Sequence, residues 1–340
     1  MSSEAAEGPI GDFLSLLRSR ASARRRTIVY PEGSDARVQE AVAECVAEGL
    51  TEAVLLGAPE AIAEGLQARG ADPGRVSIVD PDDGATIGRT LERVRERRAG
   101  RADSPEELAL MARDPLYQAG VMVADGIADG AVAGCVRTTA DVVRAGLVCL
   151  GLADDITTVS SSFYMVFGAD HPAGPAVLTF TDAGVVPNPT ADQLAEIAVS
   201  AAVARSSIVG DQPRVAFLSY STKGSAEGMS VTLARRALAQ FRERMPEVPS
   251  DGELQADAAL SPAVARHKAP GSAVAGRANV LVFPDLAAAN VSYKLVQHLG
   301  GAAALGPVLQ GLSRPFNDLS RGAIATDIVA VSCITALMAG

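Results

Sequence analysis

The sequence predicts an α/β fold built on parallel sheets, and two features of its 340 residues carry the prediction. Short segments that are apolar throughout alternate with longer amphipathic segments along the chain. Short, wholly apolar strands are typical of parallel sheets buried on both faces, and the intervening helices supply the crossovers. The composition, 48% hydrophobic and 21% charged, is that of an ordered globular protein. The length allows one large or two medium domains.

The first half of the chain predicts four strands, each followed by helices. Residues 1–11 are small and polar, and we expect them to form a disordered arm. The expected strands are residues 27–30, 52–56, 76–79 and 130–133. The expected helices are residues 36–50, 59–68, 85–98, 105–113, 116–127 and 138–150.

The second half continues the alternation, and the segment Asn188-Pro-Thr-Ala supplies capping groups for its longest helix. The expected strands are residues 157–167, 176–180, 215–218, 252–255, 279–283 and 306–309, with a turn at 168–175. The expected helices are residues 192–209, 228–243, 262–267, 285–299 and 327–338. Glycine-containing breaks near Gly151 and Gly311 are the candidate domain borders.

Charge and motif content exclude several classes of function. A net charge of −10 argues against nucleic-acid binding, because a polyanion would be repelled. No GxxxxGK[ST] or GxGxxG motif supports a nucleotide site. The three histidines lack metal-pair spacing, and no covalent nucleophile is indicated. The four cysteines lack CxxC spacing, so we expect buried free thiols. Without an apolar stretch of about 18 residues or a hydrophobic leader, we expect a cytoplasmic protein that does not enter a membrane.

The segment from Gly311 to Gly322, followed by Asp327, is the most informative stretch. It combines hydrogen-bonding side chains, two arginines and glycines in one expected loop between a strand and a helix. Helix starts favour anions, and Arg314 or Arg321 can contact phosphate with two hydrogen bonds. The alternative is a capped loop whose polar side chains satisfy backbone groups.

Several long motifs, in order, resemble the phosphate acetyl/butyryl-transferase family over residues 28–338. They are Arg214-Val-Ala-Phe-Leu-Ser-Tyr-Ser-Thr-Lys-Gly-Ser225, Asp251-Gly-Glu-Leu-Gln-Ala-Asp-Ala-Ala259, Lys268-Ala-Pro-Gly-Ser-Ala-Val-Ala-Gly276, Phe283-Pro-Asp285, Tyr293-Lys294, Gly306-Pro-Val-Leu-Gln-Gly-Leu312 and Asn317-Asp-Leu-Ser-Arg-Gly322. The resemblance implies two α/β domains, each a mostly parallel sheet between helix layers, with the active site in the cleft between them. We then expect residues 12–151 with 311–340 to form the first domain and residues 152–310 the second. A homodimer is also implied.

The implied reaction is acetyl transfer between acetyl phosphate and coenzyme A (CoA), releasing or consuming phosphate, with no tightly bound cofactor. The alternatives are a propionyl or butyryl transferase and a non-catalytic paralogue that binds CoA or acyl phosphate. By resemblance, Asp327 is the general base for the CoA thiol, Arg321 neutralises charge, and Ser320 donates to the tetrahedral species. For Asp327 alone, the competing interpretation is that it is the N-cap of the helix.

Further residues are expected to bind substrate by resemblance. Arg98 aligns with a substrate-contacting arginine, although Arg95 and Arg97 are close enough to take its place. The others are Thr138, Thr139, Arg144, Ser219, Lys268, Lys294, His298 and Asn317. A pair of threonines at a helix start is also a natural anion site.

Three departures from the family lie near these positions. Arg137 stands where most members have histidine, and Gln297-His298 stands where an arginine is common. Ala287-Ala-Ala-Asn290 replaces the usual Asn-x-Gly-Asn. Exchanging arginine for a mostly neutral imidazole weakens an anion contact, and Arg137 can compensate with a new cation. We therefore expect altered CoA or acyl specificity with the chemistry retained.

Overall fold

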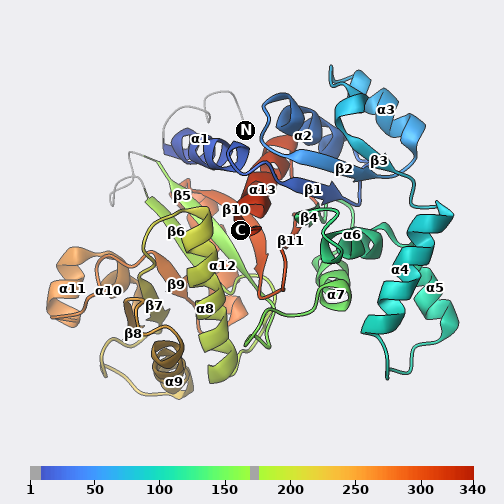
Figure 1. Cartoon of the computed structure of the whole chain (residues 1–340). Coiled ribbons are helices and arrows are strands. Elements are labelled where there is room, and N and C mark those ends of the chain that lie inside the picture. Colours follow the sequence, from blue (N-terminus) through green and yellow to red (C-terminus); the bar gives the residue numbers. More distant parts are fainter. Residues whose placement is uncertain (1–8, 169–175) are drawn as a thin grey trace. The chain divides into compact units, whose positions relative to one another are not determined.

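The computed structural model describes residues 9–168 and 176–340, and these form two compact units (Figure 1). The discontinuous unit comprises residues 15–154 and 312–340, and the inserted unit comprises residues 155–311. Helix α1 (Pro9–Ser22) starts the described chain, and its residues up to Leu14 group with the inserted unit. Residues 9–11, expected in a disordered arm, are therefore helical. Residues 1–8 of that arm and 169–175 of the expected turn lie outside the described residues.

The sheet of the discontinuous unit is parallel throughout, as short apolar strands predict. Its spatial order is β11-β4-β1-β2-β3. The strands are β1 (Thr27–Tyr30), β2 (Glu52–Leu56), β3 (Ser77–Val79), β4 (Gly130–Ala133) and β11 (Phe316–Asp318).

Helices cover this sheet. The longer helices are α2 (Ala36–Ala47), α3 (Pro59–Gln67), α4 (Gly84–Arg97), α5 (Pro105–Arg113), α6 (Pro115–Ala124), α7 (Thr139–Cys149) and α13 (Ala325–Met338). A short 3₁₀ turn, Pro73–Arg75, precedes β3. Helix α13 is apolar on nearly all sides and packs on α2, β1 and β4, which is typical of a buried helix. Helices α6 and α7 pack together, α6 on β1 and β4 and α7 on β11.

Strand β11 lies inside the segment that we expected to be a loop. Phe316-Asn-Asp has no strand pattern of its own, but Phe316 is fully buried and pairs with Ala131 of β4. Tertiary pairing, which single-sequence reasoning does not see, therefore decides the conformation.

The inserted unit contains a mixed sheet of order β10-β5-β6-β9-β7-β8. Strand β5 runs antiparallel to both neighbours, whereas β6, β9, β7 and β8 are parallel. The strands are β5 (Ser160–Phe167), β6 (Ala176–Thr181), β7 (Val215–Leu218), β8 (Ser250–Leu254), β9 (Val280–Val282) and β10 (Ala303–Gln310).

Two separate cores form around this sheet. Helices α8 and α9 enclose one core, in which Phe217 and Phe241 meet edge to face with centroids 5.8 Å apart. In the other core, Phe163 of β5 stacks on Tyr293 of α12 at 4.1 Å. The helices are α8 (Ala191–Ile208), α9 (Met229–Arg244), α10 (Ala256–Leu260), α11 (Pro262–Lys268) and α12 (Leu286–Gly300). Helix α10 was not expected, whereas the α8 cap was: Thr190 and Gln193 form a reciprocal capping box.

The α/β fold class with helix-flanked, mostly parallel sheets is confirmed. All four cysteines are buried and free, as predicted. Burial raises the pKa of the Cys135, Cys149 and Cys333 thiols to about 12. Within residues 9–168 and 176–340, no group of side chains suits a metal ion, and no helix is long and apolar enough to cross a membrane.

Candidate functional site

The carboxyl edge of the parallel sheet collects many of the predicted residues. The chain builds β1, β2 and β3 toward one side and then places β4 and β11 on the other side of β1. Such a reversal in strand order is the usual position of ligand sites in open α/β sheets. Residues 31–35, 134–138 and 319–324 leave this edge after β1, β4 and β11. These three loops form the candidate site.

Glu32 fixes the loop after β4. Its Oε2 accepts the Cys135 N–H at 2.8 Å, and its Oε1 accepts the N–H groups of Val136 and Arg137 at 3.0 and 2.9 Å. Three successive amides directed at one anion form a concave anion site. Here the protein's own carboxylate fills it.

Arg37 joins the loop after β4 to the loop after β11. Its Nη1 donates to the carbonyls of Arg321 and Ala323 at 2.8 and 3.0 Å, and its Nη2 donates to the carbonyl of Cys135 at 3.0 Å. Asp35, the N-cap of α2, holds the guanidinium through Nε and Nη2. This contact with Arg37 lowers the pKa of the Asp35 carboxyl. One fork-shaped cation therefore holds both loops.

The two predicted threonines at the start of α7 are already bonded within the protein. The Thr138 hydroxyl donates to Asp141 Oδ2 at 2.8 Å and caps the Asp141 N–H at 3.3 Å. The Thr139 hydroxyl donates to Asp318 Oδ2 at 2.5 Å. Neither hydroxyl hydrogen is left for a substrate oxygen in this state.

Asp318 is a buried carboxyl that sequence reasoning did not single out. It ends β11 with no solvent exposure. Its Oδ1 has no hydrogen-bond partner in the described parts of the chain. Burial raises its pKa to about 7, against the opposing effects of the Thr139 hydroxyl and the nearby Leu319 N–H.

Ser320 and Arg321, predicted to be catalytic, are exposed beyond β11. The Ser320 Oγ accepts the Gly322 N–H at 3.3 Å, which leaves its hydroxyl hydrogen free to donate. Arg37 holds the Arg321 carbonyl, while the Arg321 guanidinium has no ion pair within the described ranges. Both side chains are available to a ligand.

Asp327 occupies the first turn of α13, where its Oδ2 accepts the Ile324 N–H at 3.1 Å. Asp327 is the third helical residue and bonds back to the N-cap residue Ile324, so it is not the N-cap of the competing interpretation. Its carboxylate has room for further donors. Asn317 is fully buried and donates to the Thr335 hydroxyl at 2.8 Å. In this arrangement the Asn317 side chain supports α13 from inside the unit.

Arg137 forms ion pairs instead of presenting a free cation. Its guanidinium donates to both carboxylate oxygens of Asp114, at 3.2 and 2.8 Å, and lies 3.8 Å from Asp141. Arg144, 63% exposed, approaches the other oxygen of Asp141 at 3.3 Å. The two arginines and two carboxylates line a hollow of about 260 Å³ beside Tyr117. The cation gained by the Arg137 departure is thus balanced locally.

The arginines at the end of α4 have different partners. Arg98 forms a two-point ion pair with Asp103, which raises the pKa of Arg98. Arg97 donates to the Leu150 carbonyl at 2.9 Å, and Arg95 is exposed. Because Arg98 is already neutralised, its predicted substrate contact requires a rearrangement or competition with Asp103.

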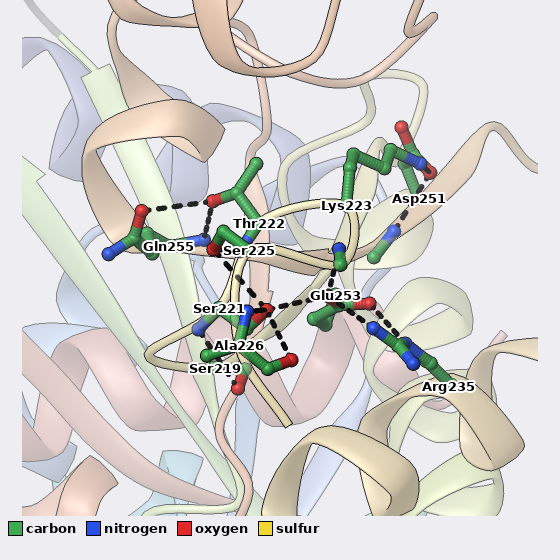
Figure 2. Close-up of polar contacts among 12 residues, drawn as sticks. Ser219, Ser221, Thr222, Lys223, Ser225, Ala226, Arg235, Asp251, Glu253 and Gln255 are labelled. Carbon is green, nitrogen blue, oxygen red and sulfur yellow. Dashed lines mark hydrogen bonds and ion pairs between the residues drawn. The ribbon is translucent and has the colours of Figure 1, made fainter. Parts of the chain in front are cut away.

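In the inserted unit, Ser219 belongs to a polar loop that Glu253 of β8 organises (Figure 2). The Glu253 carboxylate accepts the Ser221 hydroxyl and the Gly224 N–H, both at 2.8 Å, and pairs with Arg235 at 2.7 Å. The Arg235 contact lowers the pKa of Glu253 to about 2. The Ser219 Oγ accepts the Ser221 N–H at 3.3 Å, so it acts inside this network.

The remaining predicted cations of this unit are exposed. Lys268 bridges Gln255 and Asp257 at 2.9 and 2.8 Å. Lys294 lies 5.1 Å from the ring centroid of Tyr293, a cation–π distance. His298 follows one turn later on α12 and is exposed.

A family model described as phosphate acetyl/butaryl transferase matches residues 12–336. The chain belongs to this family. It is therefore an enzyme of the transferase class, and the resemblance found in the sequence is confirmed.

Relatives and solved structures agree over almost the whole length. The phosphate acetyltransferase of Paracoccus denitrificans is 42% identical over 324 residues, covering 95% of this chain and 98% of that protein. The crystal structure of a phosphotransacetylase from Streptococcus pyogenes matches with a TM-score of 0.90 and 39% identity, covering 97% and 98% of the two chains. The phosphotransacetylase EutD from Staphylococcus aureus matches at 0.88 with 36% identity, covering 98% and 100%.

Three residues of the candidate site escaped sequence reasoning: Glu32, Arg37 and Asp318. The Pro31-Glu-Gly segment directly after the first strand was the available signal for Glu32. Asp318 lay within the Asn317–Gly322 motif, where it was considered only as a side chain that satisfies backbone groups of the loop. Nothing local marked Arg37, because its three carbonyl partners come from distant loops.

Proposed function

We propose that this enzyme catalyses reversible acetyl transfer between acetyl phosphate and CoA. Its relatives are phosphate acetyltransferases over nearly their full length. One observation carries the proposal. Arg37 joins the loop after β4 to the loop that contains Ser320 and Arg321. Two loops with anion-binding groups at a switch point suit a substrate that bears a phosphoryl group.

Asp327 is the proposed general base. A neutral thiol with a pKa of about 8.5 is a poor nucleophile at pH 7, so a base near the CoA sulfur accelerates attack on the acetyl carbonyl, typically 10²- to 10⁴-fold. The Asp327 carboxylate donates no hydrogen bond and has one recorded contact at its Oδ2, the Ile324 N–H. It retains the capacity to accept a proton.

Arg321 and Ser320 are proposed to act on developing charge. The guanidinium has the fork geometry that suits a phosphate or an oxyanion, and its exposure leaves it open to a ligand. The Ser320 hydroxyl, which accepts the Gly322 N–H, keeps its hydrogen for the oxygen of the tetrahedral species. Together these groups stabilise direct thiolate attack with phosphate as the leaving group.

The test measures thioester formation by ultraviolet absorbance in wild type, Asp327→Asn and Arg321→Ala. We expect each variant to lose at least about a hundredfold in kcat/KM, or about 2.7 kcal/mol of transition-state stabilisation. Arg89→Ala is the matched control, because Arg89 is an exposed arginine on α4 outside the three loops, and we expect about wild-type rates. Near-normal activity in Asp327→Asn or Arg321→Ala would contradict the assigned roles.

The same assay with propionyl and butyryl phosphate measures the acyl preference. The paired Arg137 offers no free cation to offset the arginine absent at His298. This supports a weakened CoA contact more than a changed acyl pocket. CoA-dependent phosphate release by the pure protein excludes a non-catalytic paralogue.

We further propose that the enzyme uses CoA as a substrate with no tightly bound cofactor, acts in the cytoplasm, and forms a homodimer. Four buried free thiols suit a reducing compartment. An exposed apolar stripe on α12, formed by Val291, Leu295 and Leu299 at 56, 52 and 83% exposure, supports association of two copies.

A further inference from the structure

We propose that Asp318 is a positioning residue that sets the direction of the Thr139 hydroxyl, so that Thr139 donates to the acyl-phosphate substrate only when Asp318 carries a proton. The inference rests on the proposed function and on the predicted contact of Thr139 with substrate. It gives Asp318 a role through Thr139 and not through direct contact.

Asp318 is buried behind the Thr139 hydroxyl, which donates to it. The carboxyl is fully buried, and Thr139 is its recorded side-chain partner, at 2.5 Å. On the other side Gly134 packs so closely that an added Cβ would lie 2.2 Å from Asp318 Oδ1. Thr139 is half-buried at the first position of α7, an 11-residue helix whose start favours anions.

The proton on Asp318 decides which way the hydroxyl can act. An ionised carboxylate only accepts hydrogen bonds, so the Thr139 hydrogen is committed to Asp318 Oδ2. Thr139 then offers a ligand only lone pairs, which repel a phosphate oxygen. A protonated Asp318 donates its own O–H to Thr139 Oγ, and the Thr139 hydrogen turns outward to the phosphate.

The surroundings keep this proton exchangeable near neutral pH. Burial raises the pKa of Asp318 to about 7, and the Glu32 carboxylate after β1 adds to the rise. Cys135, after β4, also faces this carboxyl, and its own pKa is raised. Helices α7 and α13 pack on β11 and carry four more titratable or charged residues: Asp141 and Arg144 on α7, and Asp327 and Cys333 on α13. Within the described segments, none of the four has a recorded hydrogen bond or ion pair with Asp318. Thr139 is thus its direct polar neighbour.

The experiment measures KM for acetyl phosphate from pH 6 to 8.5 in wild type, Asp318→Asn, Thr139→Val and Thr139→Ser. We expect the wild-type KM to rise about tenfold across pH 7, the size of one hydrogen bond to a charged group. Asp318→Asn donates an amide N–H to Thr139 at every pH, so it should keep the low KM at pH 8. Thr139→Val should have a high KM throughout, and Thr139→Ser should follow wild type. Every variant is assayed with the same substrate. Ionisation of acetyl phosphate therefore cancels when the KM of a variant is divided by the wild-type KM at the same pH.

Two results would overturn the inference: an Asp318→Asn profile with the wild-type transition, or a Thr139→Val variant with an unchanged profile. A merely structural Asp318 would lower kcat or thermal stability without flattening the KM profile. Calorimetric titration with inorganic phosphate repeats the series without turnover. A wild type that binds phosphate with the expected pattern but forms no thioester contradicts the proposed function while supporting the role of Asp318.

Discussion

The carboxylates at the candidate site differ in how the protein satisfies them. Glu32 accepts three backbone N–H groups, and Asp327 accepts one. Asp318 is fully buried, yet one of its oxygens has no partner among the residues described. A buried polar atom without a partner is uncommon in native proteins and needs a reason. Proton exchange with a functional consequence is such a reason.

Gly134 makes the close packing at Asp318 possible and gives a residue-scale prediction. Its φ is +104°, and an added Cβ would also lie 2.7 Å from the backbone N and O of Leu319. Gly134→Ala must therefore displace Asp318 and the loop that carries Ser320. We expect kcat/KM to fall at least about tenfold. In addition, an alanine in a left-handed backbone conformation should lower the unfolding free energy by roughly 1–2 kcal/mol.

Gly126→Ala is the matched control for this change. Gly126 has a φ of +74°, and nothing lies within 4 Å of its added Cβ. It should lose stability of similar size and keep its activity. Equal activity in the two purified variants, measured beside chemical denaturation, would refute the packing argument.

Family resemblance assigned the roles of Ser320 and Asp327, whereas the chemistry of the loop also indicated Arg321, and the helix start also indicated the two threonines. Their loops do lie at one edge of the sheet, but the residues that hold those loops were not predictable. Arg37 acts on carbonyl groups far away in the chain, and any residue type offers a carbonyl. Such contacts depend on which strands end side by side, and no local pattern records that.

At the scale of elements, strongly patterned segments were predicted nearly to the residue. Strands β1, β2, β4 and β7 have the expected bounds. Two elements were missed: β11, which has no apolar run and exists because it pairs with β4, and α10, a helix of only five residues. Five residues are too few to show a helical period, and strand pairing leaves no local pattern.

The loop between β7 and α9 depends on Glu253, which gives an element-scale prediction. The folded pKa of about 2 lies below the ordinary glutamate pKa of 4.5, so we expect the buried carboxylate to stabilise the fold by about 3 kcal/mol at neutral pH. Because the folded pKa is the lower one, this contribution is complete above about pH 4.5 and declines as the pH falls toward 2. Glu253→Gln should lose about this amount at pH 7.

Denaturant unfolding of wild type and Glu253→Gln between pH 3 and 7 checks this. The difference in unfolding free energy should shrink steadily as the solution is acidified. Glu227→Gln, at an exposed position on the same loop, should stay within about 0.5 kcal/mol of wild type. A gap between wild type and Glu253→Gln that does not vary with pH would show that the ion pair with Arg235 is not its source.

At the scale of the whole molecule, the exposed stripe on α12 is the feature most at odds with a monomer. Val291, Leu295 and Leu299 recur every four residues on one face of the helix. We predict that Leu295→Glu shifts the proposed homodimer toward monomer, because a carboxylate would be buried without a partner in a symmetric interface.

Sedimentation velocity measures this shift. Leu110→Glu is the control, since Leu110 is 70% exposed on α5 and does not belong to the α12 stripe, and its sedimentation should match wild type. The assignment of the stripe fails if wild type already sediments as a monomer, or if both substitutions dissociate it equally.

Arg37 hydrogen-bonds two loops at once, and this has a consequence for ligand binding. A molecule that pulls on residues 321–323 also strains the bonds that reach Cys135, since one planar group serves both. A ligand bound at one loop should then change the free energy of binding at the other loop. By thermodynamic reciprocity, the change is equal in both directions. Binding of one proposed substrate, CoA or acetyl phosphate, should therefore change the affinity of the enzyme for the other.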